Sequence, residues 1–256
     1  MIHTWISQWH DQSLLSGFLI AYLIQIAMYI GAAGEITLVY GMLRRYLKIG
    51  ALIDDRPLLQ QQLRHEIVRS LSVALIYAVP TLLYLYYSSN HSSNYSNGIW
   101  PASWQQALWQ IGGLLLLNDF CAYWTHRLLH TRRFSKYHSA HHQSQRVTPW
   151  SALSMHAVEA LLNQIPYAIF LGVLVGLQLP MGIGTLLGLQ LVLMIGAANS
   201  HSNYNPFGAG LLLRMNNWPL LKNQTLFHQR HHRFGYDNYG YMGPHWDAVF
   251  GTSRKG

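Results

Sequence analysis

The sequence predicts an all-α protein: a multi-pass transmembrane helical bundle with a cytoplasmic, histidine-rich helical cap that holds two metal ions. Three observations lead to this fold class. Half of the 256 residues are hydrophobic and only 10% are charged, whereas a typical soluble domain carries about 25% charged residues. Several apolar stretches have the length of membrane helices, and histidines gather in three short motifs. A water-soluble enzyme, a disordered chain and a charge-rich coiled coil are therefore excluded.

Five apolar stretches are the expected helices of the bundle, because a helix needs about 20 mostly apolar residues to cross a bilayer. In chain order they cover residues 14–34, 70–87, 107–125, 160–179 and 181–200. No Lys or Arg precedes the first stretch, as it would in a cleavable signal peptide, so we expect it to remain as a membrane helix. Pro80 lies inside the second, which membrane helices tolerate. Only Pro180 separates the last two, which form a helical hairpin that either crosses twice or dips in and returns.

All 17 Lys and Arg residues occupy three segments between or after the apolar stretches. Six lie between residues 44 and 69, five between 127 and 146, and six between 214 and 255. Because cytoplasmic loops carry the excess of Lys and Arg, one topology puts all of them in the cytoplasm and leaves the N-terminus and the polar linker 88–104 outside. Orientation and attraction to anionic lipid explain the net charge of +8 and exclude a nucleic-acid partner. We expect a bacterial inner membrane or the endoplasmic reticulum as the location.

Three histidine motifs fall on the predicted cytoplasmic side. One is an HxxxH motif and two are HxxHH motifs: His126 and His130; His138, His141 and His142; His228, His231 and His232. With 15 histidines in 256 residues, about 0.05 HxxHH matches are expected by chance. Two such matches therefore indicate a metal site.

The spacing within the motifs suits ligation of metal from helices. Residues at i and i+3 or i+4 share a helix face, so His126 and His130 can point at one ion. In each HxxHH motif, we expect the residues at i and i+3 to converge on one ion and the adjacent histidine to reach a second. Eight imidazoles then supply about four ligands for each of two ions, and imidazole suits Zn, Cu, Fe and Ni alike.

Other titratable residues extend the predicted site. His201 follows the hairpin at the cytoplasmic edge and is expected as a further ligand. Asp119 shares the helix face of His126 within an apolar stretch, where ionisable residues are functional by default. It is a candidate to orient that imidazole, with a polar contact between helices as the alternative. Glu159 is a second such carboxylate, and His156 is left open between a ligand, a support for a ligand and an interfacial cap.

The remaining histidines and the single cysteine are not expected in the site. His245 is expected to be structural, and four scattered histidines are expected to face solvent: His3, His10, His65 and His91. Cys121 is alone, which excludes an intramolecular disulfide framework and a cysteine-based zinc finger.

The motifs together resemble those of the fatty acid hydroxylase/sterol desaturase superfamily, and in particular its sterol C5-desaturase-like members. Further similar segments are Asn118-Asp119 with Tyr123-Trp124, Thr148-Pro149 through His156, Asn238-Tyr239-Gly240, Trp246-Asp247 and Phe250-Gly251-Thr252. The resemblance covers residues 105–256. It implies a catalytic domain there, after N-terminal transmembrane helices and an outer linker in residues 1–104.

The resemblance implies a di-iron enzyme that uses O2 as co-substrate and two electrons to hydroxylate or desaturate an unactivated C–H bond of a membrane lipid, sterol-like or fatty-acyl. It implies nine ligands to two iron ions, for which zinc can substitute in a preparation: His126, His130, His138, His141, His142, His201, His228, His231 and His232. No catalytic residue apart from these ligands is expected. Because the sequence has no haem domain of the cytochrome b5 type, we expect an external electron donor such as cytochrome b5, a ferredoxin or a reductase. The lipid is expected to enter between the stretch 107–125 and the hairpin.

A histidine-rich membrane zinc-binding protein is the alternative. A zinc transporter would hold its ligands near the bilayer midplane on broken helices, whereas these histidines crowd at helix ends. A zinc-dependent hydrolase would need an open water site beside a general base, and Glu159 is the only acid near enough in sequence.

Overall fold

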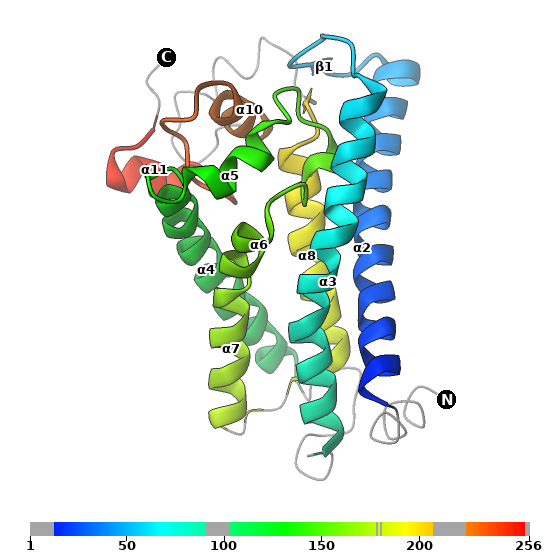
Figure 1. The fold of residues 1–256 in the computed structure, drawn as a ribbon, viewed down its shortest axis with the longest axis vertical. Coiled ribbons are helices and arrows are strands. Elements are labelled where there is room, and N and C mark those ends of the chain that lie inside the picture. The colour runs from blue at the N-terminus through cyan, green and yellow to red at the C-terminus, as the bar shows by residue number, and fades with distance from the viewer. Residues whose placement is uncertain (1–12, 91–102, 178, 180, 207–223, 254–256) are drawn as a thin grey trace.

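Long helices running side by side make up most of the computed structural model, which describes residues 13–90, 103–177, 179, 181–206 and 224–253 (Figure 1). They are α2 (Leu14–Met42), α3 (Gln60–Asn90), α4 (Trp104–Leu129), α7 (Ile165–Gly176) and α8 (Ile183–Ser200). In the described part of the chain, the only strands are the two-residue β1 (Ala51–Leu52) and β2 (Tyr204–Asn205). The predicted all-α helical bundle is confirmed.

Four helical segments are long and apolar enough to cross a membrane: Leu14–Leu47, Gln60–Tyr86, Ala157–Gly176 and Ile183–Ser200. By length and composition they make the chain an integral membrane protein. The expected span at 107–125 is not among them, although α4 has 26 residues and runs beside α7. The reason is its polar content: Gln110 and Asp119 interrupt the apolar sequence, and both are buried inside the bundle. α4 is thus a partly polar helix that turns Gln110 and Asp119 into the bundle and leaves apolar residues such as Leu116 and Phe120 exposed on its other face.

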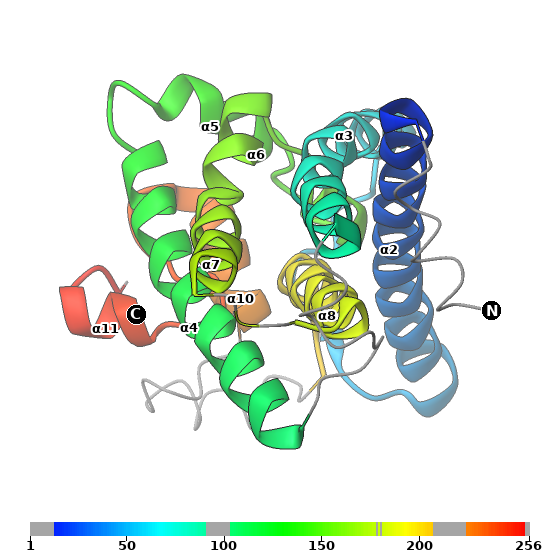
Figure 2. The same ribbon diagram turned by 90° about the horizontal axis from the view of Figure 1, so that it is seen from below.

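The bundle has two sides that meet at α8. Figure 2 shows α2 and α3 on one side and α4 and α7 on the other, with α8 between them. On the first side, Tyr29 and Ala33 of α2 pack with Val73 of α3 and Ala198 of α8. On the second side, a separate buried cluster joins α4 and α7 to α8, with Leu114, Phe170, Leu171, Leu186 and Leu189 among its members.

The hairpin runs the length of the bundle in both directions. The short helix α6 (Ala157–Asn163) leads into α7, whose end and the start of α8 lie at the end of the bundle opposite the histidines (Figure 1). This arrangement favours a hairpin that crosses twice. Its turn at Pro180 lies outside the described residues, as do residues 1–12 and positions 91–102 of the expected outer linker.

Short elements form a cap at the other end of the bundle: the π-helix η2 (Leu43–Leu47), α5 (Ser135–His142), the 3-10 helix η3 (Pro149–Ser151), α10 (Gln224–Phe234) and α11 (His245–Phe250). The antiparallel pair Ala51–Asn205 and Leu52–Tyr204 ties the segment after η2 to the segment after α8. The guanidinium of Arg69 donates to the carbonyl of Ala140 in α5 at 2.7 Å, so α3 is also fastened to the cap.

Candidate metal centre

The last turn of α4 carries the HxxxH motif. His126 and His130 lie on one face of the helix because they are four residues apart, and their ring centroids are 5.2 Å apart. His126 is buried and His130 is half-buried. α4 therefore brings two imidazoles to the cap, as the sequence predicts.

The HxxHH motifs lie on α5 and α10. In each motif the histidines are distributed between two metal-binding groups differently from the expectation. In α5, His138 and His142 join the α4 pair, whereas His141 belongs to a second group. The residues at i and i+4 thus converge, and the one at i+3 diverges. The expectation that i and i+3 share an ion is wrong because, at 3.6 residues per turn, i+4 lies about 40° from i on one side of the helix and i+3 about 60° on the other.

The second HxxHH motif repeats this division with the groups exchanged. In α10, His228 and His232 lie in the second group, and His231 crosses to the group of the α4 pair. α5 and α10 thus each give two imidazoles to one group and one to the other. This exchange joins the two groups into one structure.

Nine histidines therefore form two adjacent groups, in each of which all donor nitrogens lie within 4.8 Å of one another. The five-histidine group consists of His126, His130, His138, His142 and His231, and the four-histidine group of His141, His201, His228 and His232. His201, at the C-terminal cap of α8, completes the second group. The rings of His142 and His232, one from each group, are stacked with centroids 4.7 Å apart.

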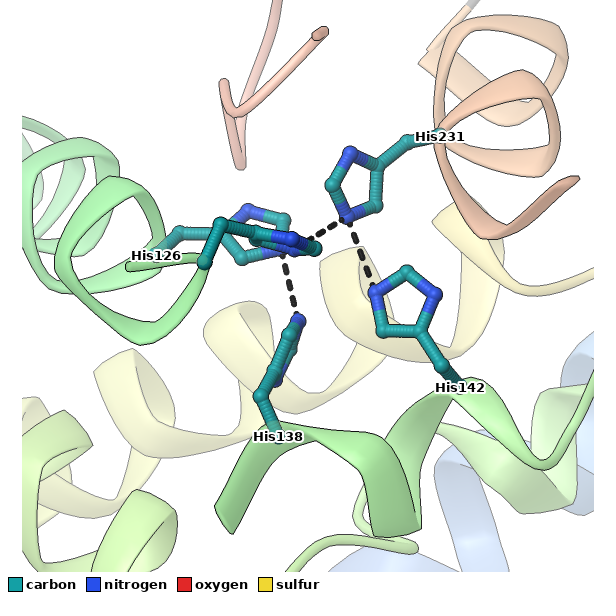
Figure 3. A group of neighbouring side chains, drawn as sticks. His126, His138, His142 and His231 are labelled. Carbon is teal, nitrogen blue, oxygen red and sulfur yellow. Dashed lines mark hydrogen bonds between the residues drawn. The ribbon is translucent and has the colours of Figure 1, made fainter. Parts of the chain in front are cut away.

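The Nε2 atoms face one another across the centre of each group. In the five-histidine group, the Nε2 separations are 3.1 Å for His126–His138 and 3.1 Å for His142–His231 (Figure 3). The Nε2 separation of His130 and His231 is 3.0 Å. In the four-histidine group they are 3.2 Å for His141–His201, 3.0 Å for His201–His228 and 3.1 Å for His228–His232.

Backbone carbonyls fix the tautomer of several rings from behind. The Nδ1 atom lies 2.9 Å from the carbonyl oxygen of Tyr239 in His126 and 2.6 Å from that of Asp237 in His231. The corresponding partners are Ser154 for His141, at 3.2 Å, and Ala197 for His201, at 2.9 Å. A carbonyl only accepts, so each Nδ1 carries the proton and each Nε2 of a neutral ring presents a lone pair. Facing lone pairs repel unless a cation lies between them.

The donor spacing fits two transition-metal ions. A metal–nitrogen bond of about 2.0–2.1 Å puts neighbouring nitrogens about 3.0 Å apart at right angles and about 3.4 Å apart in a tetrahedron. The shortest separations, 3.0–3.2 Å, lie within the range of these two values, and all donor nitrogens of each group lie within 4.8 Å of one another. Five imidazoles also exceed the four ligands of a closed tetrahedral zinc site. These residues can hold metal.

Burial keeps the imidazoles of the cap neutral. It lowers the pKa of His130 to about 3 and that of His201 to about 4, with a smaller contribution from nearby His142. Burial and the neighbouring imidazoles also lower the pKa of His141, His228 and His231 well below the usual value. Neutral imidazole is the form that ligates metal, so the site is prepared for a cation at physiological pH.

Glu159 supports the five-histidine group from the side of α6. Its Oε1 lies 2.8 Å from Nδ1 of His138, and both side chains are buried. A carboxylate behind a ligating imidazole fixes the orientation of the ring and raises its basicity. The structure thus brings Glu159 to the position expected for such a carboxylate.

Asp119 has a different role from the one expected. Its Oδ2 accepts from the ring of His245 at 2.5 Å and from the indole of Trp246 at 2.7 Å, and its Oδ1 accepts from the backbone N–H of Met242 at 3.1 Å. Two helical turns put Asp119 about 10 Å along the axis from His126, too far for contact. Asp119 therefore anchors the C-terminal segment to α4, which is the polar contact left as the alternative.

The other histidines have structural or solvent positions. His156 is the N-cap of α6, where its Nδ1 accepts from the N–H of Val158 at 3.1 Å. This is the capping role among the three left open. His245 contacts Asp119, and His65 is exposed. His3, His10 and His91 lie outside the described residues.

The sequence reasoning missed the residues that hold the carbonyl of Tyr239 against His126. Asp247 accepts from the N–H groups of Tyr239 at 2.8 Å and Gly240 at 2.7 Å, and from the hydroxyl of Thr252 at 2.6 Å. A Cβ at Gly240 would lie 2.0 Å from the carbonyl oxygen of Gly243, so this turn requires glycine. The only signal in the sequence was the likeness of this closing segment to the family pattern.

A largely apolar cavity lies in the bundle between α4, the hairpin and α3, on the bundle side of the histidines. Ala122 of α4, Pro166 of α7 and Leu193 of α8 line it. At its histidine end is Tyr241, whose ring centroid lies 6.1 Å from that of His126 and 6.4 Å from that of His228. The cavity thus ends at a residue that neighbours both groups, and it lies between the helices where lipid entry is expected.

Comparisons with known proteins agree with this site. The family model described as "Fatty acid hydroxylase" matches residues 111–252, more than half of the chain and the part that contains all nine histidines. No solved structure matches the chain at a significant level.

Several curated proteins are similar in sequence. Mouse lathosterol oxidase is 27% identical over 207 residues, covering 80% of this chain and 65% of that protein. Methylsterol monooxygenase 2-1 of Arabidopsis thaliana is 30% identical over 162 residues, covering 59% of this chain and 58% of that protein. Delta(7)-sterol 5(6)-desaturase of Leptosphaeria maculans is 26% identical over 156 residues, covering 60% of this chain and 39% of that protein. The chain spans less than two thirds of the length of these relatives.

Proposed function

The chain belongs to the fatty acid hydroxylase family, as its histidine motifs predict, and from this premise we propose that it is an integral-membrane oxygenase. It uses O2 and two electrons to hydroxylate or desaturate an unactivated C–H bond of a membrane lipid. The convergence of nine imidazoles into two groups beside Tyr241, which lines a largely apolar cavity, carries the proposal. The relatives' names, an oxidase, a monooxygenase and a desaturase of sterols, support a sterol-like lipid, with a fatty-acyl lipid as the alternative.

Iron is the proposed metal, with one ion in the five-histidine group and one in the four-histidine group. Imidazole binds iron, zinc, copper and nickel, but zinc is redox-inert. Bound iron would supply the activation of O2 that removal of hydrogen from an unactivated C–H bond requires. The fifth histidine of the five-histidine group, one more than a closed tetrahedral zinc site takes, supports this choice over zinc.

The chain's own residues would bind, orient and shield the reactants. Carbonyls of Tyr239 and Asp237 hold the rings of His126 and His231 in the tautomer that presents Nε2. The carboxyl group of Glu159 lies 2.8 Å from Nδ1 of His138, close enough to orient that ring. The apolar cavity would hold the lipid and exclude water from the reacting carbon. Tyr241 borders both the cavity and the two groups, so its side chain would contact the part of the lipid nearest the metals.

The catalytic domain is proposed to span residues 105–256, after N-terminal helices in residues 1–104, with the metal site on the cytoplasmic face. The distribution of Lys and Arg supports this orientation. An external donor would deliver electrons to the cap. A zinc transporter is not favoured, because all nine donors lie in or beside the cap and not at the middle of the bundle. A zinc hydrolase is not favoured either, because Glu159 is engaged with His138.

Metal analysis and O2 uptake test the proposal. The full chain, purified in mild detergent and loaded with ferrous iron, should bind two iron ions and consume O2 with a reductant and host lipid extract, forming an oxidised lipid. His231→Ala should abolish the product, whereas His65→Ala, which changes an exposed histidine of α3, should not. Binding of zinc alone, with no O2-dependent product under any reductant, would exclude an oxygenase.

A further inference from the structure

Three polar side chains meet inside the apolar part of the bundle, away from the histidines. Gln25 of α2, Thr81 of α3 and Gln190 of α8 are all buried. The amide nitrogen of Gln25 donates to Thr81 Oγ1 and to Gln190 Oε1, each at 3.0 Å. The amide nitrogen of Gln190 donates to Thr81 Oγ1 at 2.9 Å. We call these three residues the polar cluster.

One atom of the polar cluster lacks a partner. Gln25 uses both amide hydrogens in its bonds to Thr81 and Gln190. The hydroxyl of Thr81 accepts from the amides of Gln25 and Gln190 and donates to Gln190 Oε1 at 3.3 Å. The Oε1 of Gln25 accepts no hydrogen bond from any residue that the structure describes. Gln25 is 2% exposed and lines the cavity, and an amide oxygen in such a place is less stable without a donor, so this oxygen can accept from an N–H or O–H group of a molecule in the cavity.

The polar cluster faces the cavity that ends beside the histidines. Gln25 and Gln190 line its far part, and Tyr241 lines its histidine end. Along α8, Gln190 lies about 16 Å from His201 at about 1.5 Å per residue. The wall between them includes Leu193, Met194 and Ala197. The cavity is therefore largely apolar, although Asn118, Thr125 and Asn163 also line it, with the polar cluster in one part and Tyr241, the neighbour of both histidine groups, in another.

We infer that the polar cluster is a hydroxyl-binding site, which holds the O–H group of a lipid alcohol while the hydrocarbon body extends toward the histidines. An alcohol supplies the donor that Gln25 lacks. The described residues lining the cavity include no charged side chain, which disfavours a carboxylate, a phosphate or an ammonium group at this depth. The inference rests on the proposed function for the reaction at the other end, and it makes the oxidised carbon one that is remote from the hydroxyl.

Equilibrium binding of matched lipids, without reductant, tests the site apart from catalysis. The iron-loaded full chain in nanodiscs is titrated with cholesterol and cholesterol methyl ether, and with hexadecanol and its methyl ether. Because each ether keeps the shape but loses the O–H donor, we expect the alcohol of at least one pair to bind about tenfold more tightly than its ether. The pair that shows the preference identifies a ring-bearing or a linear alcohol as the source of the hydroxyl.

Variants assign the preference to the polar cluster. Gln25→Met removes the amide at similar volume and should reduce the alcohol-to-ether ratio to about one, with ether affinity and iron content unchanged. Gln25→Asn keeps the amide but moves it away from the cavity on a shorter side chain, so it should lower the alcohol-to-ether affinity ratio. Thr37→Val is the matched control, because it removes a hydroxyl elsewhere on α2 that donates to the carbonyl of Ala33. It should retain the full ratio.

Two results would overturn the inference: equal binding of alcohol and ether in both pairs for the wild-type protein, or an undiminished ratio in Gln25→Met. A loss of helix contacts in a variant would weaken the binding of alcohol and ether equally, so it would not change the alcohol-to-ether affinity ratio. Absence of O2-dependent turnover, by contrast, would contradict the proposed function and leave these binding ratios unchanged.

Discussion

Oε1 of Glu159 lies 2.8 Å from Nδ1 of His138, with both side chains buried behind the five-histidine group. Carbonyl oxygens occupy the corresponding position behind His126, His141, His201 and His231. His138 is thus the described ligand whose outer nitrogen faces a carboxylate, which makes Glu159 a side chain whose contribution can be tested.

Replacement of Glu159 should weaken metal binding in the five-histidine group. Loss of a carboxylate behind a ligating imidazole typically lowers metal affinity about 10–100-fold, so we expect this loss for Glu159→Leu. Glu159→Gln should lose less metal affinity, because its amide oxygen can accept a hydrogen bond from Nδ1 of His138. Chelator competition on the iron-loaded protein measures the affinity, with Asp54→Asn, a change in a surface pair with Arg56, as control. Unchanged affinity in Glu159→Leu would contradict the role.

The division of the HxxHH motifs predicts unequal effects of single histidine removals. His232→Ala leaves three imidazoles in the four-histidine group, whereas His130→Ala leaves four in the five-histidine group. We expect about one ion per chain for His232→Ala and nearly two for His130→Ala after dialysis against a weak chelator, since affinity depends on the ligand set. Elemental analysis measures the ratio. If His130→Ala loses more metal than His232→Ala, the assignment of the two groups is wrong.

Side-chain patterns predicted much of this structure, and backbone geometry supplied the rest. Apolar stretches and histidine spacing are patterns of residue type, which the sequence contains directly. The bundle, the nine converging histidines and Glu159 could therefore be predicted. The partner of the His126 ring is the carbonyl of Tyr239, and a carbonyl leaves no trace in a sequence. Asp119 was assigned to His126 because they share a helix face, but the fold brings His245 and Trp246 to it from 126 and 127 residues away.

Cysteine labelling tests the orientation of the bundle. On a Cys121→Ser background, Arg132→Cys introduces a thiol at an exposed position of the cap, and Gln105→Cys one at an exposed position in the first turn of α4. The positive-inside rule predicts that an impermeant maleimide labels position 105 in intact cells and position 132 only after permeabilisation. The reverse pattern would invert the proposed topology.

Filling the cavity should stop turnover without loss of metal. Gly196 lines the cavity, and a Cβ built there has no neighbour within 4 Å. Gly196→Leu should therefore fold and bind iron, while its side chain takes up space needed by the lipid and lowers turnover at least about tenfold. Gly188→Leu is the matched control, because Gly188 is an exposed residue of the same helix and a Cβ there is equally free. Similar turnover in the two variants would exclude the cavity as the lipid site.

Removal of metal should loosen the cap and leave the bundle intact. The lone pairs on Nε2 atoms 3.0–3.2 Å apart repel one another without a cation. α5 and α10 have only 8 and 11 residues, below the roughly 12–15 at which an isolated helix is even marginally stable. Metal at a thousand times its dissociation constant stabilises the folded state by about 4 kcal/mol. Removal of the metal should therefore unfold these two helices first.

Hydrogen exchange measures this effect segment by segment. Chelation should accelerate exchange of the backbone amides in Ser135–His142 and Gln224–Phe234, whereas Leu14–Met42 and Gln60–Asn90 should keep their protection because buried apolar contacts hold them. Reloading with zinc should restore protection of the cap but not O2 uptake, since zinc accepts imidazole ligands and is redox-inert. Equal protection of α5 and α10 with and without metal would mean that the histidines do not hold the cap together through an ion.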